Sequence, residues 1–274
     1  MTYTTVLVHA ESNPEAAERV TLAAQVARKF DATLLGVGVE MVDWMGLSDP
    51  YGMIAAEWVA LAREQVDKDL AAAEALFRSH AGAGRHEWLA LSEAPAPALS
   101  RTARRADLIV AGCAPPDDTA PLRTADAAEL ILQSGRPVLV APPGAVDLRA
   151  ERVLVAWKDS REARRATADA LPFLKRAEEV VVMEVCDAEG VYDAEQRTLE
   201  VARHLQSHGV TARPRVKVAA AARAGVELNI EAEAIGADLI VSGAYGHSRL
   251  QEWVLGGVTR DFLRRPERFV LFSH

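Results

Sequence analysis

The sequence predicts an α/β protein made of two tandem, five-stranded parallel-sheet α/β sandwiches. Short apolar runs alternate with longer amphipathic segments along all 274 residues, the pattern of strands joined by helices. The runs are apolar throughout, which is typical of parallel strands buried on both faces of a sheet. The order of strands and helices then occurs twice along the chain.

Three segments of the first half recur in the second. Ala106-Asp-Leu-Ile-Val-Ala-Gly112 returns as Ala237-Asp-Leu-Ile-Val-Ser-Gly243, and Thr5-Val-Leu-Val8 as Arg152-Val-Leu-Val155. Pro137-Val-Leu-Val140 is echoed by Phe269-Val-Leu-Phe272. Because solenoid repeats are several-fold shorter, this period indicates duplicated domains. The prolines and glycine of Ala141–Asp147 cannot continue a strand ladder, so we predict domains at residues 1–145 and 150–274.

In the first copy the pattern predicts five strands and four helices. Pro14 is tolerated in the first turn of the first helix, and Gly82–Gly84 end the long Ala-rich helix before them. The expected strands are Thr4–His9, Thr33–Val39, Glu87–Leu91, Asp107–Gly112 and Pro137–Ala141, and the expected helices are Pro14–Phe30, Ala55–His80, Ala98–Arg105 and Ala125–Gln133.

Between the second strand and the long helix lies an irregular segment, Met41–Met53, which is rich in methionine and aromatic residues. Such side chains suit adaptable apolar contacts. Two interpretations stay open: a lid or partner-binding patch, or a loop tucked onto the long helix.

The second copy repeats this order. Its expected strands are Arg152–Trp157, Glu179–Val185, Thr211–Val218, Asp238–Gly243 and Phe269–Phe272, and its expected helices are Ser160–Arg176, Asp193–His208, Val226–Ile235 and Gly257–Arg264.

A glycine-rich stretch follows the fourth strand of this copy. Gly243, Gly246 and Gly256 are spaced G-x2-G-x9-G, and Gly257 comes directly after. Glycine lets a backbone turn sharply and lets a phosphate approach amide groups without meeting a Cβ. Gly256-Gly257-Val258-Thr259 opens the last helix, whose N-terminus presents unpaired N–H donors. The pattern therefore favours a phosphate-binding loop, with a purely structural strand–helix loop as the alternative.

This stretch resembles the C-terminal signature of the universal stress protein family, G-x2-G-x9-G-(Ser/Thr), which wraps the ribose and phosphates of ATP. The resemblance covers essentially the whole chain as a tandem pair. It implies a Rossmann-like fold of the adenine nucleotide alpha hydrolase-like type. Gly257 departs from the pattern because a hydroxyl residue is expected there, and Thr259 is a candidate replacement. His247, inside the loop, either lines the ligand or faces solvent.

The ends of two other strands complete the site that the resemblance implies. The family has an acidic residue and then Gly-Ser after its first strand, whereas this chain has Trp157-Lys158-Asp159-Ser160. Lys158 cannot accept the hydrogen bonds of an acid but could reach a phosphate as a point charge. Asp159 or Ser160 could instead cap the helix that begins there. Val185 falls where the family reads adenine through backbone groups.

The first copy lacks most of these features. Gly112 is followed by Cys113-Ala-Pro115-Pro116-Asp117-Asp118, with no second glycine, and Arg123–Asp126 replaces the expected Gly-Ser. Prolines remove N–H donors, and the adjacent aspartates would repel a triphosphate, although Glu11 does hold the acidic position. We expect a non-binding half that pairs with the second. The family's domain pairing implies Val138–Val140 against Val270–Phe272, and a homodimer is a further possibility.

Composition and missing motifs exclude several classes of function. The net charge of −8 and the lack of a long basic block argue against nucleic-acid binding. No apolar run reaches the length of a membrane span and no leader is evident, so we expect a cytoplasmic protein without a membrane partner. Cys113 and Cys186 belong to no metal-binding cluster. No P-loop, nucleophile elbow or H-E-x-x-H is present, so we nominate no catalytic residue.

Two hypotheses follow. The first is a tandem universal stress protein whose second domain binds ATP, with Mg²⁺, or another adenine nucleotide. It would act as a stress-response sensor or regulator with at most weak ATPase activity. The second is a nucleotide-free interaction protein, in which the pocket or the Met-rich segment holds a small apolar ligand or a protein partner.

Overall fold

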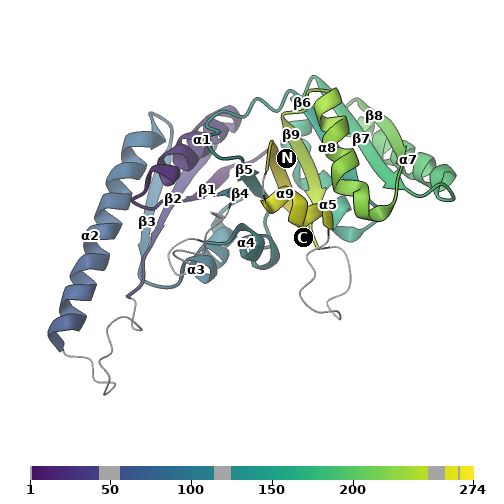
Figure 1. Ribbon diagram of the computed structural model, residues 1–274. Helices are drawn as coiled ribbons and strands as arrows, with labels where there is room; N and C mark the ends of the chain where they lie inside the picture. Colours follow the sequence, from purple (N-terminus) through teal and green to yellow (C-terminus); the bar gives the residue numbers. More distant parts are fainter. Residues whose placement is uncertain (1, 43–55, 114–124, 246–256, 265) are drawn as a thin grey trace, which may run out of the picture.

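The computed structural model describes residues 2–42, 56–113, 125–245, 257–264 and 266–274. Its described strands form one ten-stranded sheet in the order β3-β2-β1-β4-β5-β10-β9-β6-β7-β8 (Figure 1). The strands of the first half are β1 Thr5–His9, β2 Thr33–Val39, β3 His86–Leu91, β4 Leu108–Gly112 and β5 Val138–Ala141. Those of the second half are β6 Arg152–Trp157, β7 Glu179–Cys186, β8 Ala212–Val218, β9 Leu239–Gly243 and β10 Phe269–Ser273.

Helices cover both faces of this sheet. The first half carries α1 Pro14–Phe30, α2 Ala56–Ala81, α3 Pro95–Thr102, the short 3-10 turn η2 Ala103–Arg105 and α4 Ala127–Gln133. The second half carries α5 Arg161–Asp169, α6 Leu171–Leu174, α7 Val191–Ser207, the 3-10 turn η3 Ala221–Arg223, α8 Ala224–Ala234 and α9 Gly257–Arg264. Successive strand residues enter opposite cores, as with Val6 on one side and Leu7 on the other. This explains the continuous apolar runs, because a sheet covered on both faces needs no polar alternation.

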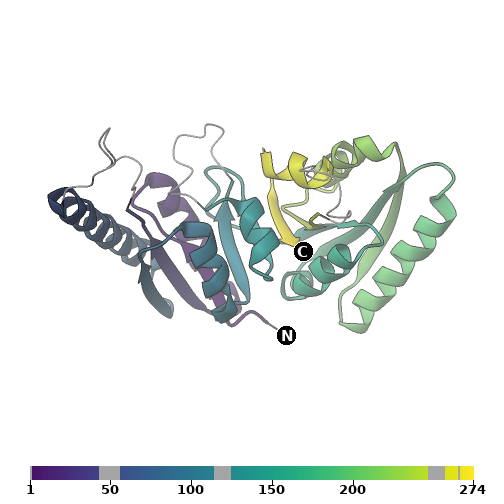
Figure 2. The same cartoon turned by 90° about the horizontal axis from the view of Figure 1, so that it is seen from below.

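The two halves meet through their last strands. Within each half the described strands pair in parallel, whereas β5 and β10 pair antiparallel, with Val140 opposite Val270 and Val138 opposite Phe272. The expected seam is therefore confirmed. Figure 2 shows the two halves side by side along this seam, each with helices on both faces of its sheet.

The repeated Ala-Asp-Leu-Ile-Val segment has a structural role in both halves. The carboxylate of Asp107 accepts hydrogen bonds from the backbone N–H groups of Thr4, at 2.7 Å, and Thr5, at 3.1 Å. Asp238 accepts in the same way from Glu151, at 3.0 Å, and Arg152, at 3.2 Å. Each aspartate thus fixes the start of the first strand of its half beside the fourth.

Away from the seam strands, three aromatic rings join the halves. Tyr3 and Phe30 of the first half contact Phe173 of the second, with ring centroids 5.6 Å and 4.9 Å from that of Phe173. The Tyr3 hydroxyl also donates to the backbone carbonyl of Asp169 at 2.6 Å. Phe173 is fully buried, and all three rings belong to one core cluster with strand residues of both halves, so this part of the core depends on both halves.

The structure corrects some expected helix bounds. The helix expected at Ser160–Arg176 is two helices, α5 and α6, with Ala170 between them and Pro172 in the first turn of the second. A proline lacks the N–H needed inside a helix but fits the first turn, which explains the break. The helix expected at Ala98–Arg105 begins earlier, at Pro95, for the same reason, and its last residues form η2. No described helix is long and apolar enough to cross a membrane.

Replacing Phe173 with Ala should destabilise the protein by about 3–5 kcal/mol, because it empties a fully buried aromatic site. Denaturant unfolding followed by far-UV circular dichroism measures the change. The control is Tyr192→Ala, which removes an aromatic ring that is 72% exposed and should change stability by less than about 0.5 kcal/mol. Equal losses of unfolding free energy in the two variants would contradict the buried core position of Phe173.

Candidate functional site

A pocket of about 420 Å³ opens at the carboxyl ends of β6, β7 and β9. The strand order reverses between β9 and β6, and ligands of open α/β sheets bind at such a switch point. Its lining comes from the ends of the three strands, the first turn of α5, the segment from η3 into α8, and the start of α9. The lining residues are Ala156, Trp157, Lys158, Ser160, Glu162, Ala163, Glu184, Val185, Ala221, Ala222, Ala224, Gly225, Leu228, Ser242, Gly243, Tyr245, Gly257, Val258, Thr259 and Asp261.

Most of the site residues that the sequence predicts and that the structure describes line this pocket. They are Trp157, Lys158, Val185, Gly243, Gly257, Val258 and Thr259. Asp159 is not among the lining residues, and its carboxylate instead accepts a hydrogen bond from Arg164 at 3.0 Å. Gly246, His247 and Gly256 lie outside the described residues. The same holds for Trp44, Met45, Tyr51 and Met53 of the Met-rich segment, and for Pro115, Pro116, Asp117, Asp118 and Arg123 of the first half.

Gly243 allows β9 to end directly against the start of α5. A Cβ built there would lie 2.5 Å from the backbone N of Ala163 and 2.6 Å from the carbonyl carbon of Glu162. No side chain fits at such distances, so the helix could not approach the strand. Ser160 fixes this helix end, because its hydroxyl accepts a hydrogen bond from the N–H of Ala163 at 3.2 Å. The first glycine of the motif is therefore needed for strand–helix packing, and the expected cap is formed by Ser160.

Gly257 has a different environment. A Cβ built on it meets no atom of the described structure within 4 Å, although the residue lines the pocket and is the first residue of α9. The first N–H groups of a helix have no partner within the helix and carry partial positive charge. The start of α9 thus presents backbone donors to the pocket, and two residues later Thr259 is buried.

Three carboxylates in the lining were missed by the sequence analysis: Glu162, Glu184 and Asp261. Glu184 is buried at the end of β7 and accepts a hydrogen bond at 2.6 Å from the Arg197 guanidinium of α7. An acid inside the apolar run Val180–Val185 was the signal that could have revealed it, because a buried charge requires a partner.

Glu162 lies in the first turn of α5 and is also buried. Burial alone would raise the pKa of this carboxyl, but hydrogen bonds from Arg161, from its own backbone N–H and from Ser160 outweigh it and hold the pKa below the usual range. Both buried acids of the pocket therefore have a neighbouring arginine, Arg161 beside Glu162 and Arg197 beside Glu184.

Two buried polar atoms in the lining have no hydrogen-bond partner among the described residues: the indole Nε1 of Trp157 and the hydroxyl of Tyr245. Burial, with a smaller contribution from Asp126 of the first half, raises the pKa of Tyr245 to about 12, so the hydroxyl keeps its proton. An unmade hydrogen bond at a buried group costs about 1–3 kcal/mol. A ligand with suitably placed acceptors would satisfy both groups.

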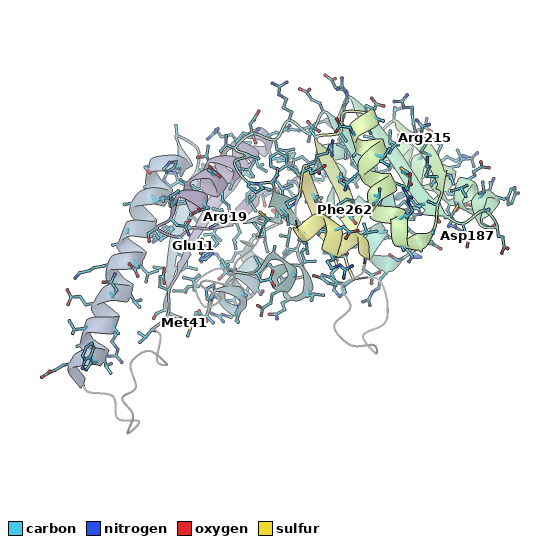
Figure 3. All side chains as sticks on the ribbon, in the orientation of Figure 1. Glu11, Arg19, Met41, Asp187, Arg215 and Phe262 are labelled. Atoms are coloured by element: carbon cyan, nitrogen blue, oxygen red, sulfur yellow. The ribbon has the colours of Figure 1, made fainter. Side chains whose placement is uncertain are left out.

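The corresponding place in the first half is filled by the protein itself. Arg19 of α1 is buried and donates to the Glu11 carboxylate at 2.6 Å and to the His9 carbonyl at 3.0 Å (Figure 3). Its guanidinium would lie 3.3 Å from a Cβ built on Gly112, the counterpart of Gly243. The acidic residue that sequence reasoning placed at this site is therefore engaged in an internal ion pair.

Comparison with known proteins extends these observations. Residues 150–272 match the model of the Universal stress protein family. No curated protein sequence matches the chain. Among the described residues there is no group of three or more His, Cys, Asp or Glu side chains that could hold a metal ion.

Solved structures match over almost the full length. A universal stress protein from Archaeoglobus fulgidus DSM 4304 is 16% identical, with a TM-score of 0.71, over 98% of this chain and 97% of that chain. A protein from Pseudomonas aeruginosa UCBPP-PA14, provisionally named a universal stress protein, is 17% identical with a TM-score of 0.57, over 99% and 93% of the two chains. At these identities the matches establish the tandem fold. A universal stress protein in complex with cAMP covers 51% of this chain and 97% of its own, at 22% identity and a TM-score of 0.36.

Replacement by alanine should lower stability at one of the two described glycines of the motif and leave it unchanged at the other. Gly243→Ala forces a Cβ into the α5 backbone and should cost at least about 1–3 kcal/mol of stability, as overpacking does. Gly257→Ala meets no atom of the described residues and should leave stability within about 0.5 kcal/mol. Thermal and denaturant unfolding measure both. Tolerance of Ala at Gly243 would refute the packing role.

Stability should fall as the pH drops from about 6.5 to 4 because of His9. Burial lowers the pKa of this imidazole to about 4, so in that window the unfolded chain binds a proton that the folded protein does not. Folding is then favoured above pH 6.5, and the full loss at low pH is on the order of 3 kcal/mol. Replacing His9 with Gln should flatten the dependence of unfolding free energy on pH within this window. The control His208→Gln changes an exposed imidazole and should leave the slope unchanged. A slope that stays the same in His9→Gln would contradict the prediction.

Proposed function

The chain belongs to the universal stress protein family through residues 150–272, and from this premise we propose that its second half binds ATP or another adenine nucleotide. The observation that carries the proposal is the pocket of about 420 Å³ at the sheet's switch point, into which the start of α9 opens. Its volume lies within the range of small-molecule sites, about 300–1,000 Å³. We further propose that the protein acts as a sensor or regulator and not as a metabolic enzyme.

The two unpartnered groups support a purine-containing ligand. The Trp157 Nε1–H is only a donor, and the protonated Tyr245 hydroxyl can donate as well. A purine ring presents nitrogen acceptors at its edges, and ribose hydroxyls add further acceptors. A bound nucleotide would therefore accept hydrogen bonds from these two groups, which have no partner among the described residues. These hydrogen bonds would supply part of the binding affinity.

The phosphates would contact the cationic and donor groups of the lining. Lys158 and the first N–H groups of α9, at Gly257, supply positive charge and donors there. The carboxylates of Glu162 and Glu184 oppose a polyphosphate, but Arg161 and Arg197 contact them and reduce that repulsion. Mg²⁺ is commonly held by one or two carboxylates together with substrate phosphates, and Asp261 is a carboxylate of the lining suited to such an ion. The ion would neutralise phosphate charge.

The competing function is a nucleotide-free interaction protein. Lys158 in place of the family's acid and Gly257 in place of its hydroxyl residue favour it, together with three carboxylates in the lining. In this case the glycines would be kept for packing, the role that Gly243 has against α5.

Identification of any nucleotide that copurifies separates the two. Freshly purified protein is denatured, released small molecules are identified by chromatography, and emptied protein is titrated with ATP and Mg²⁺ by calorimetry. We expect an adenine nucleotide near one per chain, or binding with that stoichiometry. No released nucleotide together with no heat of binding would reject nucleotide binding and favour the interaction protein.

Replacing Lys158 with Ala should weaken ATP binding about five- to tenfold, because it removes a cation worth about 1 kcal/mol at a partly exposed site. Lys175→Ala makes the same charge change at an exposed position of the same half and should leave the affinity unchanged. Calorimetric titration of both variants measures the difference. Equal ATP affinities in the two variants would show that Lys158 does not contact the phosphates.

A further inference from the structure

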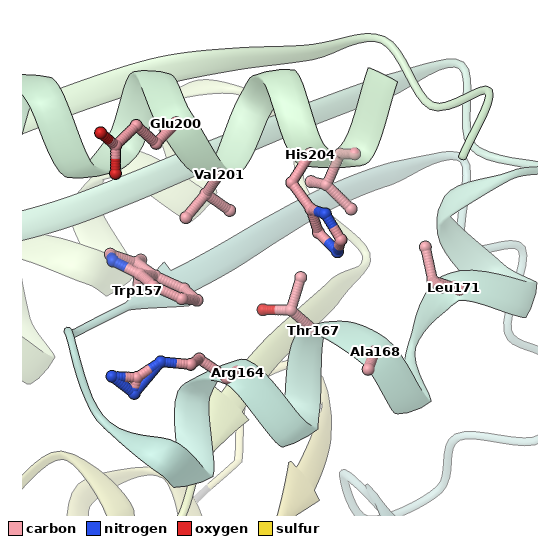
Figure 4. Close-up of a pocket in the computed structure, with 9 residues that line it drawn as sticks. Trp157, Arg164, Thr167, Ala168, Leu171, Glu200, Val201 and His204 are labelled. Carbon is pink, nitrogen blue, oxygen red and sulfur yellow. The ribbon is translucent and has the colours of Figure 1, made fainter. Parts of the chain in front are cut away.

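A second pocket, of about 290 Å³, lies between α5 and α7, next to Trp157 at the end of β6 (Figure 4). Its lining residues are Trp157, Arg164, Thr167, Ala168, Leu171, Glu200, Val201, His204 and Leu205. We propose that this pocket binds a small, uncharged aromatic molecule of one or two fused rings, with the indole of Trp157 as its inner wall. The two pockets share the side chain of Trp157 and are otherwise lined by different residues, with α7 belonging to this pocket and α8 and α9 to the other.

The inner walls are apolar. Leu205 is fully buried and Val201 is 9% exposed, so both present hydrocarbon surface from α7. On α5 the buried Thr167 donates its hydroxyl proton to the Ala163 carbonyl at 2.8 Å, so this hydroxyl offers a ligand no free donor. A ligand that entered would bury its own apolar surface, at about 25 cal/mol per Å².

The flat indole of Trp157 favours an aromatic occupant over an aliphatic one. Figure 4 shows its ring at one end of the space, with Val201 above and Arg164 below. Aromatic pairs in offset or edge arrangements gain stability beyond that of the buried area. The volume is close to the lower limit of ligand pockets, about 300 Å³, so a ring system fits and a drug-sized molecule does not.

Charges at the rim favour an uncharged occupant. Glu200 and His204 stand on α7 and Arg164 on α5, all exposed, and the Arg164 guanidinium already donates to Asp159 at 3.0 Å. The rim therefore carries both signs, so a charged ligand of either sign would meet a like charge there as well as an opposite one. A charged molecule would lose hydration at the apolar walls without recovering it.

The first half packs its equivalent helices more closely than the second half does. There α1 packs along the long α2, and Phe77 of α2 is fully buried over β2. In the second half α5 stops at Asp169, before Pro172, and α7 is shorter than α2. The helices α5 and α7 approach each other much less closely than α1 and α2, and the pocket is the gap between them.

Indole is a suitable probe, and its binding to the ¹⁵N-labelled full chain can be followed by NMR. We expect saturable shifts of the amides of Thr167, Leu171 and Val201, with indole-3-acetate binding at least tenfold more weakly. A filling variant, Ala168→Trp, places a ring over the pocket from an exposed position of α5 and should weaken indole at least tenfold. The matched control Ala72→Trp makes the same change on the exposed face of α2 and should have no effect.

Several results would overturn the proposal. They are the absence of saturable shifts at these amides, equal indole affinity in Ala168→Trp and Ala72→Trp, or cyclohexanol binding as tightly as indole. If Ala168→Trp does not fold, His204→Trp fills the pocket from α7 and gives the same test. Failure of ATP binding would leave these outcomes unchanged, because every readout concerns the pocket between α5 and α7.

Discussion

The antiparallel pairing of β5 with β10 is the constraint on which the rest of the structure depends. Each half is a parallel sheet whose last strand, alone, would be an apolar edge with unpaired backbone groups, and such edges promote aggregation. Val138–Ala141 and Phe269–Ser273 are buried along their length, which requires a neighbour on that side. Pairing the two edges within one chain supplies it, and the ring cluster of Tyr3, Phe30 and Phe173 stabilises the same arrangement at a second place.

Within this shared frame the two halves have diverged where their first strands end. The caps are equivalent, because Asn13 accepts from the Ala16 N–H at 2.7 Å as Ser160 accepts from that of Ala163. The residues beside the caps differ between the two halves. The first half buries Glu11 with Arg19 next to Gly112, whereas the second half leaves a pocket beside Gly243. A buried ion pair satisfied by its own chain needs no ligand, so at this place the described residues of one half form an ion pair and those of the other form a pocket.

The fold could be predicted from the sequence because its signals are local and repeated. Apolar runs, the twice-occurring Ala-Asp-Leu-Ile-Val segment and the proline breaks each act within a few residues. The break between α5 and α6 differs from the single helix expected at Ser160–Arg176, which has Pro172 in its interior. The site was predicted only in part, because burial of its helix residues depends on tertiary packing. Trp157, Lys158 and Val185 follow strands and could be placed, but Glu162 carries no mark that distinguishes it from a solvated helix residue. Its burial depends on how closely α5 approaches β9, a distance set by tertiary packing at Gly243.

Because Gly243 is needed for packing, the glycine motif by itself does not indicate that a ligand binds. Gly243 is explained by the backbone of Glu162 and Ala163 alone, and a chain that had lost its ligand would still need it. Gly257 is different, because no atom of the described residues lies near the place where its side chain would stand, and packing against those residues gives no reason for a glycine there. The Trp157 Nε1 and the Tyr245 hydroxyl, which have no hydrogen-bond partner among the described residues, belong to the same category, since packing alone does not favour an orphaned donor in a buried wall. The features that packing among the described residues does not require are therefore the ones that favour a ligand, and they gather around one pocket.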